Sequence, residues 1–456
     1  MEHIILSNMW KHLHKHNIIL HFQHGFQSGL SCESQLIETV HDWMTAMDNK
    51  TQIDAILLDF AKAFDKVPHL RLLSKLTSYG ITGNTKNWIK SFLSNRKQRV
   101  SVNGALSDIT DVTSGVPQGS VLGPVLFLLY INDINGNIKS SIRLFADDSI
   151  IYRKISSKTD HEILQTDLSQ LQTWSDKWQM EFNVSKCVHL PITNKTKPST
   201  HKYSLSGQPL STVSSHSYLG VKLDSKLTWT NHVTDITSKS SKCLGMIKRT
   251  LGPCKPEVKQ TAYNMLIRPK LEYSSPIWNP HTFSQVKSLE RVQHSAARFV
   301  KNDYRRNTNP ADLITALGWP TLERRRIIKQ ATTFYKILNN IIEITPPSRP
   351  TNSLSNPWTI HSPQVSYKCN GLFILSQSHS HMEYDSIKNY QHKKPKIISR
   401  SYYGTPFHHT SSPKLPLKHS AQRKLIHGVG METVYVCMWQ GSDSIHTHNQ
   451  PIKIFR

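Results

Sequence analysis

The stretch SIRLFADDSIIY, residues 141–152, places two adjacent carboxylates between two apolar runs. These runs predict two β-strands, and residues 146–149 predict a tight hairpin connection with Asp147 and Asp148 at its tip. Two like charges this close raise each other's pKa unless a cation neutralises them. The pattern therefore indicates a divalent metal site, although an ordinary surface turn, in which aspartate is common, explains the same stretch.

A second stretch supplies a third carboxylate. A short apolar run, typical of a buried strand, ends at Asp59. Three carboxylates on two neighbouring strands can hold a pair of Mg²⁺ ions about 3.5–4 Å apart, the arrangement that serves phosphoryl transfer. Between the two stretches, residues 114–124 form a loop rich in Gly and Pro that leads into an apolar helix at 125–131. Such a loop lets the backbone approach a ligand closely.

Three segments in this order resemble the palm motifs of reverse transcriptases. They read LLDFAKAFDKVPH (57–69), SGVPQGSVLGP (114–124) and LFADDSIIY (144–152). They are most similar to the polymerase of non-LTR, LINE-type retrotransposons of the jockey or CR1 kind. Each motif alone is a weak signal, but three in this order and spacing are specific. The resemblance extends over roughly residues 1–345.

The resemblance implies an α+β fold, the right-hand polymerase, with an antiparallel-sheet palm that has helices on one face, partial helical fingers and a helical thumb. The expected domains are partial fingers at 1–50, a palm at 51–230 with an inserted fingers segment at about 70–110, and a thumb at 231–345. The implied activity is RNA-directed DNA polymerisation, in which dNTPs extend a primer 3′-hydroxyl. The implied partners are an RNA template, a DNA primer and their RNA–DNA hybrid, and the implied cofactor is a pair of Mg²⁺ ions.

The same resemblance assigns roles to individual residues. Asp59, Asp147 and Asp148 are the expected catalytic residues and metal ligands. Lys186 lies in the segment NVSKC (183–187), which resembles a fourth palm motif, and is expected beside the departing pyrophosphate. The residues expected to contact the incoming nucleotide are Phe60, Ala63, Phe64, Gln118 and Gly119. Among them, Phe64 matches the family's steric gate against the ribose 2′-hydroxyl.

Two groups of basic residues are candidates for nucleic-acid contact. One is the loop that contains Arg96, Lys97 and Arg99. The other is a helical stripe opposite an apolar face in segment 284–301, and it comprises Lys287, Arg291, His294, Arg298 and Lys301. A solvated charged surface explains the loop equally well, and it stays an alternative for the stripe because exposed helix faces commonly carry Lys and Arg.

The composition favours a polyanionic partner. The 456 residues include 56 Lys and Arg against 31 Asp and Glu, a formal net charge of +25. The longest apolar run, residues 121–131, is far shorter than the ~20 residues that span a bilayer. The six cysteines show no zinc-finger spacing. We therefore expect a soluble intracellular protein, cytoplasmic and nuclear, with no membrane association and no evident protein partner.

The two ends of the chain carry separate predictions. Residues 1–50 predict two amphipathic helices around the loop QHGFQSG (23–29), in which Gln27 replaces the arginine usual in the family. The chain opens within the fingers, so we expect either a copy truncated at its 5′ end or an incomplete gene model. After residue 346 the hydrophobic periodicity stops, and residues 346–456 are expected to be a disordered or out-of-frame tail.

Two alternatives stay open. An intron-encoded maturase would share the palm motifs, but it would lack the thumb-like segment SPIWNPHT (275–282) and carry a maturase domain after it. A catalytically inactive retrotransposon relic would only bind nucleic acid through its basic surface.

Overall fold

The computed structural model describes residues 1–344, so the tail predicted at 346–456 lies outside the described residues. The described residues divide into two units, residues 1–98 with 109–344 and residues 99–108. The described part of the second unit is a ribbon of two antiparallel strands, β3 (Ser101–Val102) and β4 (Ala105–Leu106). The sheet, the helices and the candidate site belong to the first unit.

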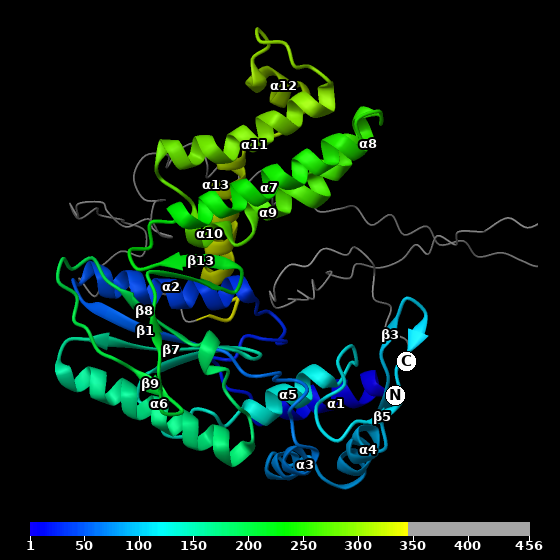
Figure 1. Ribbon diagram of the computed structural model, residues 1–456, viewed down its shortest axis with the longest axis vertical. Coiled ribbons are helices and arrows are strands. Elements are labelled where there is room, and N and C mark those ends of the chain that lie inside the picture. The colour runs from blue at the N-terminus through cyan, green and yellow to red at the C-terminus, as the bar shows by residue number, and fades with distance from the viewer. Residues whose placement is uncertain (345–456) are drawn as a thin grey trace, which may run out of the picture. The chain divides into compact units, whose positions relative to one another are not determined.

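A five-stranded sheet forms the centre of the first unit (Figure 1). In spatial order its strands are β11 (Ser211–Thr212), β8 (Val188–Ile192), β1 (Gln52–Leu58), β7 (Asp148–Ile155) and β6 (Ser141–Phe145). The central strand β1 pairs antiparallel with both β7 and β8, whereas β11 joins β8 in parallel. Every residue of β1 is buried, as its apolar sequence predicts for a central strand.

Side chains alternate along β1, so the sheet has an apolar core on each face. Ile56 and Leu58 pack in a core shared with α3 (His69–Ser78), α5 (Gly123–Ile131) and α6 (Lys158–Trp178). Ala55 and Leu57 pack in a second core shared with α2 (Cys32–Asp48). Figure 1 shows α2 and α6 on opposite sides of the strands. The fold is α+β as predicted, but the prediction of helices on one face is wrong, because both faces of the sheet are apolar.

The other elements before residue 230 are mostly short: α1 (Glu2–Lys15), α4 (Gly83–Leu93), β2 (Lys97–Gln98), β5 (Thr110–Asp111), η1 (Val184–Lys186), β9 (Ser204–Leu205), β10 (Gln208–Pro209), β12 (Ser215–Tyr218) and β13 (Val221–Asp224). Strands β12 and β13 form a tight antiparallel hairpin. Its turn, Leu219-Gly220, has φ angles of 46° and 77°. The left-handed region suits glycine, which has no Cβ to clash.

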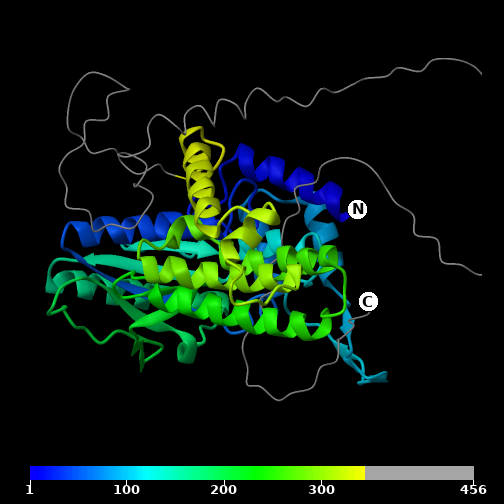
Figure 2. The same cartoon turned by 90° about the horizontal axis from the view of Figure 1, so that it is seen from above.

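From residue 230 to residue 344 the chain forms helices and no strand: α7 (Thr230–Thr250), α8 (Pro256–Ala262), η2 (Tyr263–Ile267), α9 (Arg268–Glu272), α10 (Ser275–Trp278), α11 (Phe283–Lys301), α12 (Pro310–Ala316) and α13 (Leu322–Leu338). Helices α7 and α11 run side by side (Figure 2). Their apolar faces share the core that also contains the buried side of α2. Among the helices of residues 1–344, none combines the length and the apolar character that crossing a membrane requires.

Candidate active site

The pairing register brings the predicted carboxylates together. Strand β1 runs antiparallel to β7 with Leu58 opposite Ser149. Asp59 follows Leu58 and Asp148 precedes Ser149, so these two aspartates occupy neighbouring positions at the same end of the sheet. Asp59 and Asp148 are 89 residues apart in the sequence, and the pairing of β1 with β7 brings them together.

The turn between β6 and β7 is shorter than predicted. Phe145 pairs with Asp148, which leaves Ala146 and Asp147 as a two-residue connection. The predicted connection over residues 146–149 is therefore wrong in length, and Asp148 begins a strand instead of sharing the tip. Ala146 makes this tight turn possible by adopting a φ of 54°, the left-handed conformation that two-residue hairpin turns require.

The three carboxyl groups are electrostatically coupled. The surrounding protein atoms and the negative charges of Asp147 and Asp59 raise the pKa of Asp148 to about 7, although Asp148 is an exposed residue at the end of the sheet. Burial and the charge of Asp59 also raise the pKa of Asp147. Burial raises the pKa of Asp59 as well, against the opposing effect of nearby cations. The cluster therefore resists carrying its full negative charge at neutral pH.

Three further side chains surround Asp59. The Lys186 ammonium lies 4.0 Å from an Asp59 carboxylate oxygen, so the structure places this predicted residue beside the cluster. His216, on β12, acts on the Asp59 carboxyl electrostatically, while its own pKa is lowered by burial. The Asp59 amide donates a hydrogen bond of 3.4 Å to the buried Cys187 sulfur, and burial raises the pKa of this thiol to about 11. Sequence reasoning missed both residues, because His216 lies outside the motif segments and Cys187, although it ends the NVSKC segment, meets Asp59 only in the folded chain.

The chemistry of the donors suits Mg²⁺, which prefers carboxylate oxygens. Three neighbouring carboxyl groups whose pKa values are all raised by burial, with the charge of Asp59 also acting on Asp147 and Asp148, form the kind of site that a bound cation neutralises. Within residues 1–344, no three carboxylate, imidazole or thiolate side chains converge closely enough to hold one ion. Binding a metal at this cluster would therefore require the aspartate side chains to turn toward a common point.

The backbone after Asp59 offers unpaired donors. The Ala61 amide is already used, because it donates to the Glu181 carbonyl at 2.8 Å. Within the described residues the amides of Lys62, Ala63 and Phe64 donate no hydrogen bond. Lys62 adopts a left-handed φ of 53°. Successive amides around a left-handed residue form a concave site that binds anions, so this turn can hold a phosphate group.

The aromatic residues of this segment face different surroundings. Phe60 is buried and stacks on Phe182 at a centroid distance of 4.5 Å, so its side chain belongs to the core. Phe64 is only half buried, and it stacks on Phe127 at 4.3 Å and meets Phe26 edge to face at 6.3 Å. Packing on Phe127 fixes the ring of Phe64 while one side stays accessible. Phe60 can therefore meet a ligand only through its backbone, whereas Phe64 can use its ring.

The Gly/Pro-rich loop is tied to the segment after Asp59. The side-chain amide of Gln118 donates to a carboxylate oxygen of Asp65 at 2.9 Å, and the Ser114 hydroxyl donates to the Asp65 carbonyl at 2.8 Å. Both Gln118 and Gly119 are exposed. Gly119 has a φ of 80°, which favours glycine at this position. The two motif segments are thus held side by side.

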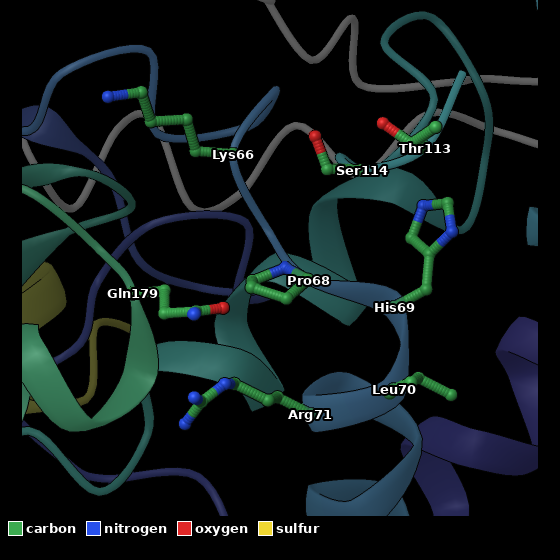
Figure 3. Close-up of a pocket in the computed structure, with 8 residues that line it drawn as sticks. All are labelled: Lys66, Pro68, His69, Leu70, Arg71, Thr113, Ser114 and Gln179. Atoms are coloured by element: carbon green, nitrogen blue, oxygen red, sulfur yellow. The ribbon is translucent and has the colours of Figure 1, made fainter. Parts of the chain in front are cut away.

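A cavity of about 410 Å³ lies beside these segments (Figure 3). It is lined by Lys66, Pro68, His69, Leu70, Arg71, Thr113, Ser114 and Gln179. Its lining side chains supply cations, hydroxyls and an amide but no carboxylate. Lys66 forms an ion pair of 2.6 Å with Glu181, and Arg71 donates to the Lys177 carbonyl. The cavity therefore suits an anionic group better than a cationic one.

The basic loop predicted to contact nucleic acid is exposed. Arg96 and Lys97 belong to the first unit and Arg99 to the second. All three side chains are exposed, and Lys97, in β2, lies 3.9 Å from an Asp111 carboxylate oxygen. An ion pair of two exposed groups contributes little stability, so it would not prevent Lys97 from contacting phosphate.

The predicted stripe on α11 is divided by the structure. Lys287, Arg291 and Lys301 are exposed, while the opposite apolar face is buried. Arg298 instead donates hydrogen bonds to the carbonyls of Arg305 at 2.9 Å and Thr308 at 2.8 Å. The Arg298 guanidinium thus holds the loop after α11, and its contact with nucleic acid stays a prediction.

Comparisons with known proteins agree with these motifs. Residues 1–223 match the family described as "Reverse transcriptase (RNA-dependent DNA polymerase)". The chain is 31% identical over 291 residues to the "Probable RNA-directed DNA polymerase from transposon X-element" of Drosophila melanogaster, covering 61% of this chain and 31% of that protein. It is 30% identical over 315 residues to the "RNA-directed DNA polymerase from mobile element jockey" of the same organism, covering 65% of this chain and 34% of that protein.

The chain thus spans about a third of the length of the curated relatives it matches. Among solved structures, one of telomerase from Candida tropicalis with a fragment of telomeric RNA has 12% identity and a TM-score of 0.34. This similarity covers 68% of this chain and 46% of that one.

The coupled carboxylates predict a pH-dependent stability. Because the pKa of Asp148 is raised to about 7 in the folded protein, its protonation stabilises the fold, and this stabilisation is complete below the ordinary pKa of the carboxyl. With EDTA present, so that no metal binds, the stabilisation is lost as the pH rises through about 7. Replacing the ionised group relieves the repulsion, so Asp148→Asn should raise the melting temperature more at about pH 8 than at about pH 5. Thermal denaturation at the two pH values measures this.

The exposed Asp176, near the end of α6, provides the matched control. Asp176→Asn should shift the melting temperature equally at both pH values. A destabilised Asp148→Asn protein at about pH 8, or a shift independent of pH, would contradict the coupling.

Proposed function

We propose that this chain, whose residues 1–223 match the reverse transcriptase (RNA-dependent DNA polymerase) family, extends a primer 3′-hydroxyl with dNTPs on an RNA template. The observation that carries the proposal is the meeting of Asp59, Asp147 and Asp148 at one end of the sheet, where burial raises the pKa of all three. A noncatalytic nucleic-acid binder has no need of such a cluster, which weakens the fold unless a cation is bound.

The family generally uses divalent metals, and we assign the metal-binding role here to Asp59, Asp147 and Asp148. When bound, two Mg²⁺ ions would supply charge stabilisation for the attacking and leaving oxygens. The protein's own contribution is to hold three carboxylates at one sheet end through strand pairing. Lys186, 4.0 Å from Asp59, would add positive charge where the pyrophosphate departs.

The remaining contacts with the nucleotide come from the two motif segments. The unpaired amides of Lys62, Ala63 and Phe64 would bind the triphosphate. The accessible side of the Phe64 ring would exclude a ribose 2′-hydroxyl, because its stacking on Phe127 prevents it from moving aside. Gln118, with Gly119 beside it, would meet the base pair formed by nucleotide and template.

The architecture supports a palm at 51–230 built on the five-stranded sheet, with partial fingers at 1–50 and in the inserted segment. The helices from α7 to α13 would form the thumb, and α11 would present its exposed cations to an RNA–DNA hybrid. Such a reaction would take place where template RNA and primer DNA meet, in the cytoplasm or the nucleus.

Primer extension on the purified full chain tests the proposed reaction. With an RNA template, a DNA primer, dNTPs and Mg²⁺, the unaltered protein should lengthen the primer. Asp147→Asn removes one negative charge at nearly constant volume, so it should reduce the extension rate by at least about 100-fold. Duplex binding, measured in parallel, should change little. Absence of extension by the unaltered chain, or full activity of Asp147→Asn, would refute the proposal.

The gate assignment predicts a change in sugar selectivity. Phe64→Val shortens the side chain and opens space beside the sugar, so the ratio of rNTP to dNTP incorporation should rise, on the order of 10-fold or more. Competition between matched dNTP and rNTP in primer extension measures the ratio. Phe92→Val, at an aromatic stacked on Trp88 in α4, serves as the control and should leave the ratio unchanged. An unchanged ratio for Phe64→Val would remove Phe64 from the gate role.

The exposed cations of α11 predict a salt effect. Each Lys or Arg that neutralises a phosphate adds about 0.9 to the slope of log affinity against log salt. Lys287→Gln combined with Arg291→Gln should therefore lower the slope for an RNA–DNA hybrid by about 2. The control is Lys158→Gln with Lys177→Gln, at exposed positions of α6. Equal slopes for the two double variants would show that the α11 cations are merely solvated.

A further inference from the structure

The segment from Phe22 to Gly25 lies along the outer edge of the sheet. Strand β6 is the last strand of the sheet, and the Leu144 amide donates to the Phe22 carbonyl at 2.9 Å. The His24 amide in turn donates to the Leu144 carbonyl at 2.9 Å, so Gln23 and Leu144 form a parallel bridge. The segment therefore covers part of an exposed strand edge and brings Gln23 level with the end of β6.

The side chain of Gln23 extends past strand β6 to the turn at Ala146. Its side-chain oxygen accepts hydrogen bonds from the Ala146 amide at 2.9 Å and from the Gly25 amide at 2.8 Å. Its side-chain nitrogen lies 3.5 Å from the Ala146 carbonyl. Gln23 is 2% exposed, so these bonds are shielded from water. Losing the acceptor would leave the Ala146 amide buried and unpaired.

Gly25 packs directly against the same residue. A Cβ atom at position 25 would stand 2.4 Å from the Ala146 nitrogen, closer than atoms can approach. Position 25 requires glycine because of this close approach to Ala146. The backbone of Gly25 itself is not left-handed. Ala146, by contrast, is an alanine with a φ of 54°, a conformation that is strained for a residue with a Cβ. The surroundings must hold it there.

We propose that Gln23 and Gly25 form a clamp on the Ala146 turn that positions the carboxylate of Asp147. The assignment of Asp147 to catalysis rests on the proposed function, whereas the clamp itself rests on these contacts. Because Asp147 follows Ala146 directly, the orientation of the Ala146 peptide sets where the Asp147 side chain begins. Gln23 and Gly25 are therefore positioning residues, which act on the reaction through the turn.

The first test measures the turn without requiring activity. In the purified full chain without metal, Gln23→Met should speed amide hydrogen exchange in a peptide covering residues 142–149 by about 10-fold, because one buried hydrogen bond is lost. Gly25→Ala should do the same by displacing the Ala146 backbone, and it provides a second variant if Gln23→Met folds poorly. Unchanged exchange of residues 142–149 in folded Gln23→Met and Gly25→Ala proteins would overturn the clamp.

Gln293→Met is the matched control. Gln293 is also a buried glutamine bonded at both ends of its side-chain amide, to the Tyr263 hydroxyl at 2.7 Å and the Pro320 carbonyl at 3.0 Å. Its substitution should lower the melting temperature without changing exchange in residues 142–149. Equal acceleration of that peptide by Gln293→Met would show general loosening of the fold and would contradict a specific clamp.

The second test separates positioning from general destabilisation. Gln23→Met should slow primer extension on the order of 100-fold and raise the Mg²⁺ concentration for half-maximal rate, because the Asp147 carboxylate is misplaced. Adding Ala146→Gly should recover much of that loss, since glycine adopts a positive φ without strain. No recovery would count against the clamp. If the unaltered chain extends no primer, the proposed function fails, while the exchange experiment still decides the clamp.

Discussion

Repulsion among three carboxyl groups is the constraint on which this structure depends. Strand pairing sets Asp59 beside Asp148, and the two-residue turn adds Asp147. Burial, together with the charges of Asp147 and Asp59, raises the pKa of Asp148 to about 7. A protein keeps such an arrangement only if the surrounding scaffold resists relaxation, because a small separation of the strands would relieve the repulsion. Apolar cores on both faces of the sheet supply that resistance.

Buried polar groups also fix the positions of strands β1 and β6. Asp54, fully buried on β1, accepts hydrogen bonds of 2.7 Å from both Gln52 and the Tyr203 hydroxyl. These and a bond from His189 lower its pKa although burial alone would raise it. At the other side of the sheet, Arg143 on β6 lies 2.9 Å from a Glu38 carboxylate oxygen of α2. Satisfied networks of this kind specify one arrangement of strands and helices, since each broken bond would leave a buried polar atom unpaired.

The sequence predicts the parts of the site that follow from local pattern. An apolar run ending in Asp59 and the Asp147-Asp148 pair between strands identify the carboxylates, and helical spacing identifies the two faces of α11. Features that depend on tertiary contacts escape this reasoning. The turn is shorter than predicted because Gln23 and Gly25, over 120 residues away in sequence, hold Ala146 in a left-handed conformation.

On α11, helical spacing places Arg298 in the cationic stripe, but it does not reveal that the Arg298 guanidinium also bonds to carbonyls of the following loop. His216 and Cys187 approach Asp59 only through the packing of β12 and η1. The count of protons released when Mg²⁺ binds tests the account most directly. Calorimetric titration at about pH 7, in two buffers of different ionisation enthalpy, should show release of about half a proton from a carboxyl whose pKa is about 7. Equal heats in both buffers would mean that no proton leaves, and would contradict the claim that these carboxylates are coupled and await a cation.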